Sequence, residues 1–364
     1  MRHVRPRAVV FAVIFLVAFD IALRLINPVW FPSNFRMPDR TLVGYDRFVE
    51  SMKRHPGVRI AVVGDSVFFG SFTLPDGTLS SHLSQVYSGE GRRVSAYNFG
   101  LSGAHMIDLM PVVANIADQH AADVIVLQFD PRFASAHESV HRRYPTLYDD
   151  VPDWGPLRGS PMIHIGEKPS DPPGFEERAS TLAGDVSALY GDRQYLAAAS
   201  LGDMPSAAVT LEMNRLESTL SGKALFGKRA WASLKFNNIR RTYDIPPYTA
   251  ENTHIQLLEA TLDAARSRGV SVVVVSGPVD SDLLDGKKLW DPVAYRANLE
   301  TVRGLVQQRG GTFVDMTYAV PSALIHDSHH PISAGYRTMA EKLAVAMDPV
   351  VRSAEASRGL VSTQ

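Results

Sequence analysis

The stretch VRIAVVGDSVFFG, from Val58 to Gly70, decides the fold that the sequence predicts. Its first half is an unbroken apolar run, which is typical of a parallel strand covered on both faces. The run stops at Gly64 and is followed by Asp65 and Ser66. In open α/β sheets, ligands bind in the crevice beyond the carboxyl ends of the strands, so Ser66 is a candidate nucleophile. Asp and Ser are also ordinary helix-capping and turn residues, and the tripeptide alone does not decide between the two interpretations.

Further apolar runs and amphipathic segments alternate along the chain on both sides of a long interruption. Strands are predicted at Val94 to Asn98, Ala122 to Phe129, Val270 to Ser276 and Thr312 to Met316, and helices at Thr78 to Ser88, Glu251 to Arg268, Pro292 to Arg309 and Ile332 to Val351. Gly269 and Gly310 follow two of these helices, as residues that end helices commonly do. The alternation predicts an α/β fold with a doubly wound, parallel, five-stranded sheet.

The composition is that of a globular protein with a sizeable core. Of 364 residues, 45% are hydrophobic and 21% charged. The net charge of −1 implies no basic face in the total, so a nucleic-acid partner is not expected. The absence of cysteine excludes disulfides, thiol nucleophiles and Cys-ligated zinc, although it assigns no compartment.

The apolar segment from Ala8 to Ile26 predicts an N-terminal transmembrane helix. Its 19 residues would be about 28 Å long as a helix, close to the thickness of a bilayer's hydrocarbon core. Arg2, Arg5 and Arg7 precede it, so the N-terminus is expected in the cytoplasm and the remainder outside, in the periplasm or the extracellular space. A cleaved signal peptide is the alternative, but no small-x-small cleavage pattern follows the apolar core.

These patterns divide the chain into four predicted parts. Residues 1–31 are the cytoplasmic tip and anchor, and residues 32–57 a tether. Residues 58–133 and 250–352 form the α/β domain. Residues 134–249 are rich in proline and too long for a loop, so they are interpreted as an inserted subdomain or lid, with only modest helical periodicity near 176–190 and 207–220. Its aromatic residues, among them Tyr144, Tyr148, Trp154 and Trp231, are candidates either for glycan contacts or for ordinary core packing.

A second candidate block, HDSHHP at residues 326–331, comes after the last predicted strand and so lies at the same edge as Ser66. Asp327 and His330 are three residues apart, which lets a carboxylate accept a hydrogen bond from the imidazole Nδ1 while Nε2 faces a neighbour. Serine needs such a general base because its hydroxyl is a weak nucleophile at neutral pH. The alternatives for this histidine cluster, which also contains His326 and His329, are a metal site or a solvated loop. No carboxylate-rich motif supports metal, so neither metal nor cofactor is expected.

In order along the chain, these blocks resemble the SGNH (GDSL-type) hydrolase superfamily. Gly64-Asp65-Ser66 matches the nucleophile block, residues 98–103 (NFGLSG) match the second block, and residues 327–331 (DSHHP) match the D-x-x-H-P block. The resemblance implies a flavodoxin-like fold with Ser66 as nucleophile, His330 as base and Asp327 as its orienting group. It also implies two oxyanion donors, the backbone N–H groups of Ser66 and Gly103.

The third block of the family is missing. Where relatives have G-x-N-D, with an asparagine that binds the oxyanion, this chain has LQFDPR at residues 127–132. Losing one such donor typically costs roughly 10² to 10³ in kcat. Gln128 or Arg132 could replace it. The hypothesis is that Arg132 reaches back to the oxyanion, and the alternative is a surface arginine or a salt bridge to Asp130.

The resemblance leaves three functions open. The first is a membrane-anchored, extracytoplasmic serine esterase that acts on acyl esters, such as acetyl esters, of a cell-surface glycan or lipid. The second is an O-acyltransferase of exported polysaccharide that receives its acyl group from a multi-span membrane acyltransferase. The third is a catalytically silent member that binds glycan through the aromatics of the insertion.

Overall fold

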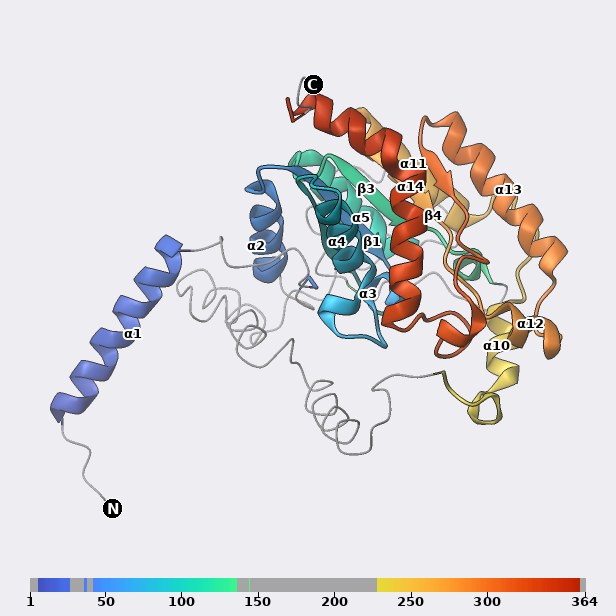
Figure 1. The fold of residues 1–364 in the computed structure, drawn as a ribbon, viewed down its shortest axis with the longest axis horizontal. Coiled ribbons are helices and arrows are strands. Elements are labelled where there is room, and N and C mark those ends of the chain that lie inside the picture. Colours follow the sequence, from blue (N-terminus) through green and yellow to red (C-terminus); the bar gives the residue numbers. More distant parts are fainter. Residues whose placement is uncertain (1–5, 27–35, 38–41, 136–143, 145–227, 361–364) are drawn as a thin grey trace, which may run out of the picture.

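The computed structural model describes residues 6–26, 36–37, 42–135, 144 and 228–360 (Figure 1). Its centre is a five-stranded parallel sheet in the order β2-β1-β3-β4-β5. The strands are β1 (Val58–Gly64), β2 (Val94–Gly100), β3 (Val124–Gln128), β4 (Ser271–Val275) and β5 (Thr312–Val314). This is the flavodoxin-like order, with a switch point between β1 and β3. The predicted α/β class, strand number and parallel topology are therefore confirmed.

The register of the sheet brings the ends of its strands to one edge. Gly64, the last residue of β1, lies opposite Gly100, the last residue of β2, and Gln128 at the end of β3 lies opposite Val275 of β4. Because all the strands run in one direction, the segments after them emerge together. Ser66 and the loop after β2 therefore lie at the same edge.

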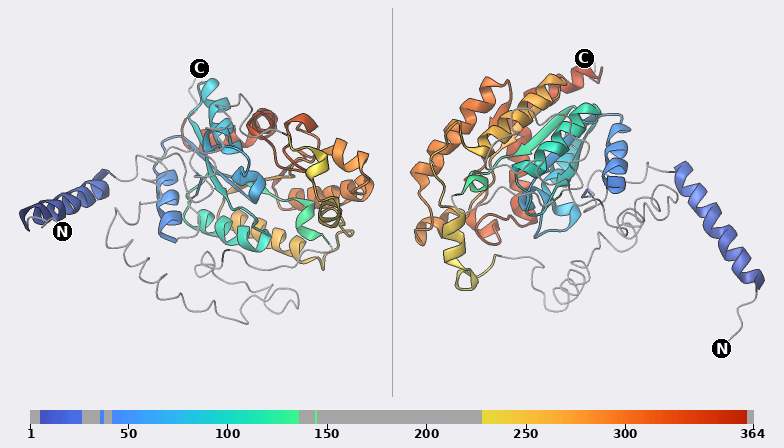
Figure 2. Two further views of the ribbon diagram at one scale, coloured as in Figure 1. Left: turned by 90° about the horizontal axis from the view of Figure 1, so that it is seen from below. Right: turned by 180° about the vertical axis from the view of Figure 1, so that it is seen from behind.

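Helices cover both faces of the sheet, as the views in Figure 2 show. One face carries α2 (Leu42–Lys53), α5 (Met106–Asp118), α11 (Thr253–Ser267) and α13 (Pro292–Gln308), and the other carries α4 (Leu79–Gly89) and α14 (Ser333–Ser357). The side chains of β1 alternate between the two cores: Ala61 and Val63 pack on the first, Ile60 and Val62 on the second. Burial on both faces explains the continuous apolar run of β1. The shorter helices are α3 (Ser66–Phe69), α10 (Phe236–Thr242) and α12 (Ser281–Gly286).

The predicted tether, residues 32–57, contains the helix α2, which belongs to the domain. Tyr45, Phe48, Val49 and Met52 of this helix are buried in the first core, and the Phe48 ring packs 4.9 Å from that of Phe99. These residues follow the i, i+3, i+4, i+7 spacing of an amphipathic helix. The tether assignment is therefore wrong for α2, because its apolar stripe covers the sheet beside β2.

The N-terminal apolar segment forms helix α1 (Pro6–Ile26), whose side chains are described for residues 10–22. Large apolar side chains on it are exposed, including Phe11 at 71% and Phe15 at 67%. Among the described residues, no helix is long and apolar enough to cross a membrane, so the predicted transmembrane helix is not found there.

Most of the predicted insertion, residues 136–143 and 145–227, lies outside the described residues. So do the helices expected near 176–190 and 207–220, together with Tyr148 and Trp154. Two aromatic candidates of the insertion are described. Tyr144 is buried and donates a hydrogen bond to the carbonyl of Ser102 at 2.7 Å, and Trp231 is half-buried against the first core.

Candidate active site

Ser66 begins the short helix α3 directly after β1. Asp65 is its N-cap, and the carboxylate accepts a hydrogen bond from the backbone N–H of Val67 at 2.7 Å. Gly100 of the neighbouring strand lets α3 sit this close to the sheet, because a Cβ there would lie 2.3 Å from the backbone nitrogen of Phe69. A capped helix pressed on the sheet edge therefore fixes the direction of the Ser66 side chain.

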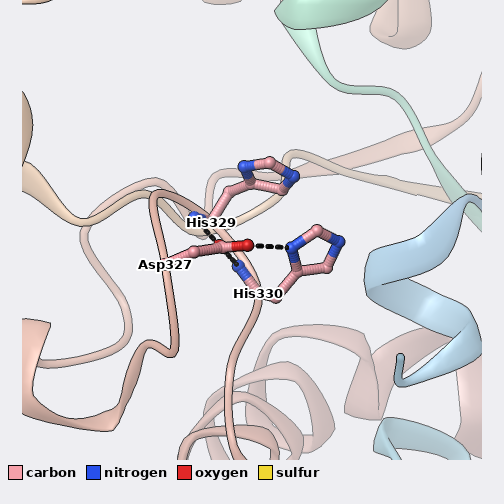
Figure 3. Close-up of side chains that lie close together, drawn as sticks. All are labelled: Asp327, His329 and His330. Atoms are coloured by element: carbon pink, nitrogen blue, oxygen red, sulfur yellow. Dashed lines mark hydrogen bonds and ion pairs between the residues drawn. The ribbon is translucent and has the colours of Figure 1, made fainter. Parts of the chain in front are cut away.

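The loop that carries Asp327 and His330 closes on itself at the other side of the site. His326 donates its backbone N–H to the carbonyl of His330 at 2.7 Å. Inside the loop, one oxygen of Asp327, Oδ1, accepts the backbone N–H groups of His329 and His330, both at 3.0 Å. The other oxygen, Oδ2, lies 2.9 Å from the His330 Nδ1 (Figure 3). The carboxylate is thus held rigidly by three hydrogen bonds.

Ser66, His330 and Asp327 form one continuous hydrogen-bonded chain. The Ser66 Oγ lies 2.8 Å from the His330 Nε2, on the side of the ring opposite Asp327. An ionised carboxylate only accepts, so the Nδ1 carries the proton and the Nε2 is left to accept from the Ser66 hydroxyl. The structure therefore brings together the three residues that the sequence singled out, although Ser66 is 261 or more positions away from the other two in the chain. Their arrangement is that of a nucleophile, a base and an orienting group.

The electrostatic surroundings keep Asp327 ionised. Burial alone would raise the pKa of this carboxyl, but His329, His330 and the backbone N–H of His329 hold it well below its usual range. His329 responds in the opposite way to its own surroundings: burial, together with the charges of Arg132 and His330, lowers the pKa of its imidazole. The Nδ1 of His329 lies 2.8 Å from the Ser328 hydroxyl.

Aromatic contacts pack the loop against the segment after α3. The ring of Phe72 stacks on His326 with centroids 4.0 Å apart and meets the His330 ring edge-on at 5.1 Å. His329 packs at 4.1 Å against His330. The His330 ring is thereby held between two rings, which limits its rotation away from Ser66.

The alternative of a metal site can be tested against the same geometry. Ligand atoms of Asp327, His329 and His330 lie within 4.8 Å of one another, which is close enough for one ion. However, the two nitrogens of His330 face Ser66 and Asp327, and both Asp327 oxygens accept hydrogen bonds. Since the donor atoms are engaged in this way, the arrangement favours the triad over metal ligation.

Gly103, the proposed oxyanion donor, lies three residues beyond the end of β2. Its φ of +76° is in the left-handed region that favours glycine, and the turn is closed by a hydrogen bond from the Ala104 N–H to the Leu101 carbonyl at 3.0 Å. Because β2 and β1 end opposite each other, this turn lies at the same edge of the sheet as Ser66.

Arg132, for which the sequence suggested a role at the oxyanion, is paired with acidic side chains, and its role as an oxyanion donor stays a prediction. Its Nη2 lies 2.6 Å from Asp130 Oδ2 and 3.6 Å from Asp65 Oδ2, and its side chain is buried. The alternative of a salt bridge to Asp130 therefore describes this structure, because two buried carboxylates hold the guanidinium. Arg132 touches the site through Asp65, the neighbour of Ser66.

Gln128 has a role that the sequence did not reveal. Its Oε1 accepts the backbone N–H of Asp65 at 3.0 Å, so the end of β3 supports the nucleophile turn. A Cβ on Gly64 would lie 2.5 Å from that oxygen, so a glycine is needed there. Burial raises the pKa of Asp65, and the charge of Arg132 only partly offsets this effect. The signal available in the sequence was the polar amide of Gln128 at the end of an otherwise apolar predicted strand.

Comparison with known proteins finds weak structural similarity and no sequence match. A family 3 carbohydrate esterase from Clostridium thermocellum has a TM-score of 0.38 and 12% identity, over 81% of this chain and 98% of that one. A catalytic mutant of an acetylxylan esterase from Geobacillus stearothermophilus has a TM-score of 0.39 and 11% identity, over 81% and 96%. For a lipase/acylhydrolase from Enterococcus faecalis the values are 0.39 and 9%, over 80% and 96%. No family model and no curated protein matches the chain.

Proposed function

We propose that this protein is a serine acyl-ester hydrolase of the SGNH type. The observation that carries the proposal is the hydrogen-bonded chain from the Ser66 Oγ to the His330 Nε2 at 2.8 Å and from its Nδ1 to Asp327 at 2.9 Å. The motif order along the chain and the flavodoxin-like strand order support it. Each of the three side chains is placed by local hydrogen bonds, as catalysis requires.

The geometry performs acyl transfer in two steps. The Ser66 oxygen attacks the acyl carbonyl while the His330 Nε2 takes the hydroxyl proton, and the charged imidazole is stabilised by Asp327. Backbone N–H groups of Ser66 and Gly103 are the proposed donors to the oxyanion, and the His330 proton then leaves with the alcohol. Water, activated by the same His330, attacks the acyl-serine, releases the carboxylic acid and restores Ser66.

The proposed substrate is an acyl ester, such as an acetyl ester, of a cell-surface glycan or lipid. In the second candidate function, a sugar hydroxyl replaces water in the last step, and the acyl group is delivered by a multi-span membrane acyltransferase. The observation that favours transfer is the departure from G-x-N-D at residues 127–132. An oxyanion hole with only two backbone donors would make the protein a weak hydrolase. Weak hydrolysis suits a transferase that depends on a partner protein.

The experiment is to treat the purified protein with a serine-reactive fluorophosphonate and to measure hydrolysis of an aryl acetate. We expect labelling at Ser66, and turnover should fall by roughly 10³-fold or more in Ser66→Ala and in His330→Ala. His329→Ala is the matched control and should lose less than roughly tenfold, because its ring packs on the base without contacting Ser66. A folded protein without labelling or turnover would favour the silent, glycan-binding alternative.

We also propose that the α/β domain works outside the cytoplasm and is held at a membrane by α1. The arginines ahead of this helix and the exposed apolar side chains along it support the proposal. The test is protease treatment of intact cells, combined with fractionation and a washed membrane pellet. Degradation of the domain from outside and recovery in the pellet are expected. Protection of the domain, with a reporter on the N-terminus exported, would overturn the orientation.

A further inference from the structure

Residues 228–241 form a segment that differs in charge from the rest of the chain, and we name it the basic segment. It contains five basic residues and no acidic one, whereas the whole chain has 37 and 38. The basic residues are Lys228, Arg229, Lys235, Arg240 and Arg241. A concentration of one sign in a nearly neutral protein creates a local positive potential at this place.

The basic segment lies directly against the loop that carries the catalytic base. At its start, Arg229 donates its backbone N–H to the carbonyl of His326 at 2.7 Å. Just beyond its end, the Tyr243 hydroxyl donates to the carbonyl of Ser328 at 3.3 Å. The two ends of the segment are thus held by hydrogen bonds to residues within four positions of His330, so the segment lies beside the loop that carries His330.

A buried anchor holds the start of this segment. The Lys228 ammonium lies 2.8 Å from Asp280 Oδ2, whose side chain is fully buried, and also donates to the Ser322 carbonyl at 3.0 Å. Asp280 in turn donates its backbone N–H to the Ser328 carbonyl at 2.8 Å. Lys228 is therefore committed to structure, and its ion pair with the buried Asp280 fixes the position at which the rest of the basic segment begins.

The remaining charges point to a ligand because they are exposed and not neutralised by the protein. Lys235, Arg240 and Arg241 are exposed, and within the described part of the chain no ion pair engages them. Arg240 and Arg241 lie in the last turn of α10, which is about 10 Å long and begins after Lys235. Lys287 of the neighbouring turn adds a further cation, held over the rings of Trp231 and Phe236.

We infer that the basic segment binds an anionic, carboxylate-bearing polysaccharide and guides its ester groups to Ser66. The inference rests on the proposed acyl-ester chemistry and adds the class of polymer on which it acts. A group of exposed cations suits a polyanion, since several carboxylates of one polymer can pair with it. A neutral glycan would leave these charges without partners.

The test measures binding alone, so that it does not depend on turnover. Full-length Ser66→Ala protein is titrated with a polygalacturonate oligomer and with a neutral xylan oligomer of the same length. We expect binding of the polygalacturonate only, weakening with salt as charges beyond the Debye length of about 10 Å at 0.1 M are screened. The double variant Arg240→Gln, Arg241→Gln should lower the affinity roughly tenfold.

A matched control removes the same charge elsewhere. Arg93→Gln, Arg266→Gln changes two exposed arginines outside the segment and should leave the affinity unchanged. Equal binding of xylan, equal loss in the control, or binding only to vesicles containing phosphatidylglycerol would overturn the inference. Aryl acetate turnover in the Arg240, Arg241 variant with Ser66 intact should stay at its basal level. If the proposed function is wrong, the fluorophosphonate will not label Ser66, and this result does not depend on whether the protein binds the polymer.

Discussion

At the scale of single residues, the most informative contact is the ion pair of Arg132 with Asp130 and Asp65, the residue before Ser66. All three side chains are buried, with exposed fractions of 8% or less. Arg132 thus neutralises two carboxylates that would otherwise face each other without solvent, one of them next to Ser66. Removing one partner of a buried pair is costly because the other charge is left uncompensated.

We therefore expect Arg132→Met to lower the free energy of unfolding by roughly 3 to 5 kcal/mol, as measured by urea denaturation. Adding Asp130→Asn should recover part of the loss, because one of the two stranded carboxylates is removed. Arg352→Met is the control: its guanidinium pairs with Asp348 but is 70% exposed, so less than about 1 kcal/mol should be lost. Unchanged stability together with a large fall in kcat would instead make Arg132 a direct donor to the oxyanion.

At the scale of elements, the approach of α3 to β2 depends on Gly100. We expect Gly100→Ala to be strongly destabilising and to reduce Ser66 labelling, since the new Cβ would lie 2.3 Å from the Phe69 nitrogen and 2.6 Å from its Cα. Backbone atoms cannot rotate away, so α3 itself has to move. Gly304→Ala in α13 is the opposite case, with no atom within 4 Å of its Cβ, and should raise stability by about 0.5 to 1 kcal/mol. Thermal melting and fluorophosphonate labelling of both variants test this contrast.

The elements also separate the features that the sequence could predict from those that it could not. Strands such as β1 were predictable because burial on both faces leaves continuous apolar runs. Helix α5 was missed because Pro111 lies inside it, where proline normally interrupts a helix. Helix α2 was assigned to a tether because flanking prolines and charges concealed its four-residue apolar stripe.

The site shows the same division. Ser66, Asp327 and His330 could be found because their motifs are local and their strand ends meet at one edge. The supporting contacts of Gln128 with Asp65 and of Arg132 with Asp130 depend on side-chain directions, which strand periodicity alone does not fix. The contact of residues 228–241 with the loop that carries His330 was likewise hidden, because a backbone hydrogen bond from Arg229 to His326 joins segments about 100 positions apart.

At the scale of the whole molecule, buried histidines couple the stability of the domain to pH. Burial is the largest cause that lowers the pKa of four histidines, His55, His82, His254 and His329. The pKa of His254 is lowered to about 3, and the charge of His105 contributes to that decrease. In the unfolded chain these groups return to about 6.5. Below that pH the unfolded state binds more protons than the folded state, so stability is lost as the pH falls.

The pH dependence of the free energy of unfolding tests this coupling. The free energy of unfolding should be nearly constant from pH 8 to about 6.5 and then decrease, with each neutral buried histidine contributing about 1.4 kcal/mol per pH unit. Asp327, whose folded pKa is depressed, loses its contribution only below its unfolded pKa of about 3.9, so it does not add to the slope from about 4.5 to 6. Asp65, whose pKa is raised by burial, acts against the histidines there, and a variant that removes one histidine leaves that contribution unchanged.

His254→Phe should flatten the pH profile in this range, because it removes a histidine whose pKa burial lowers to about 3. The control His120→Asn should not flatten it, because His120 is exposed. Asparagine is chosen there because the φ of His120, +46°, is left-handed and asparagine tolerates that conformation. Urea unfolding at a series of pH values, monitored by tryptophan fluorescence, measures both slopes. An unchanged slope in His254→Phe would mean that this imidazole is already protonated in the folded state, with its charge paired in the core between α5 and α11.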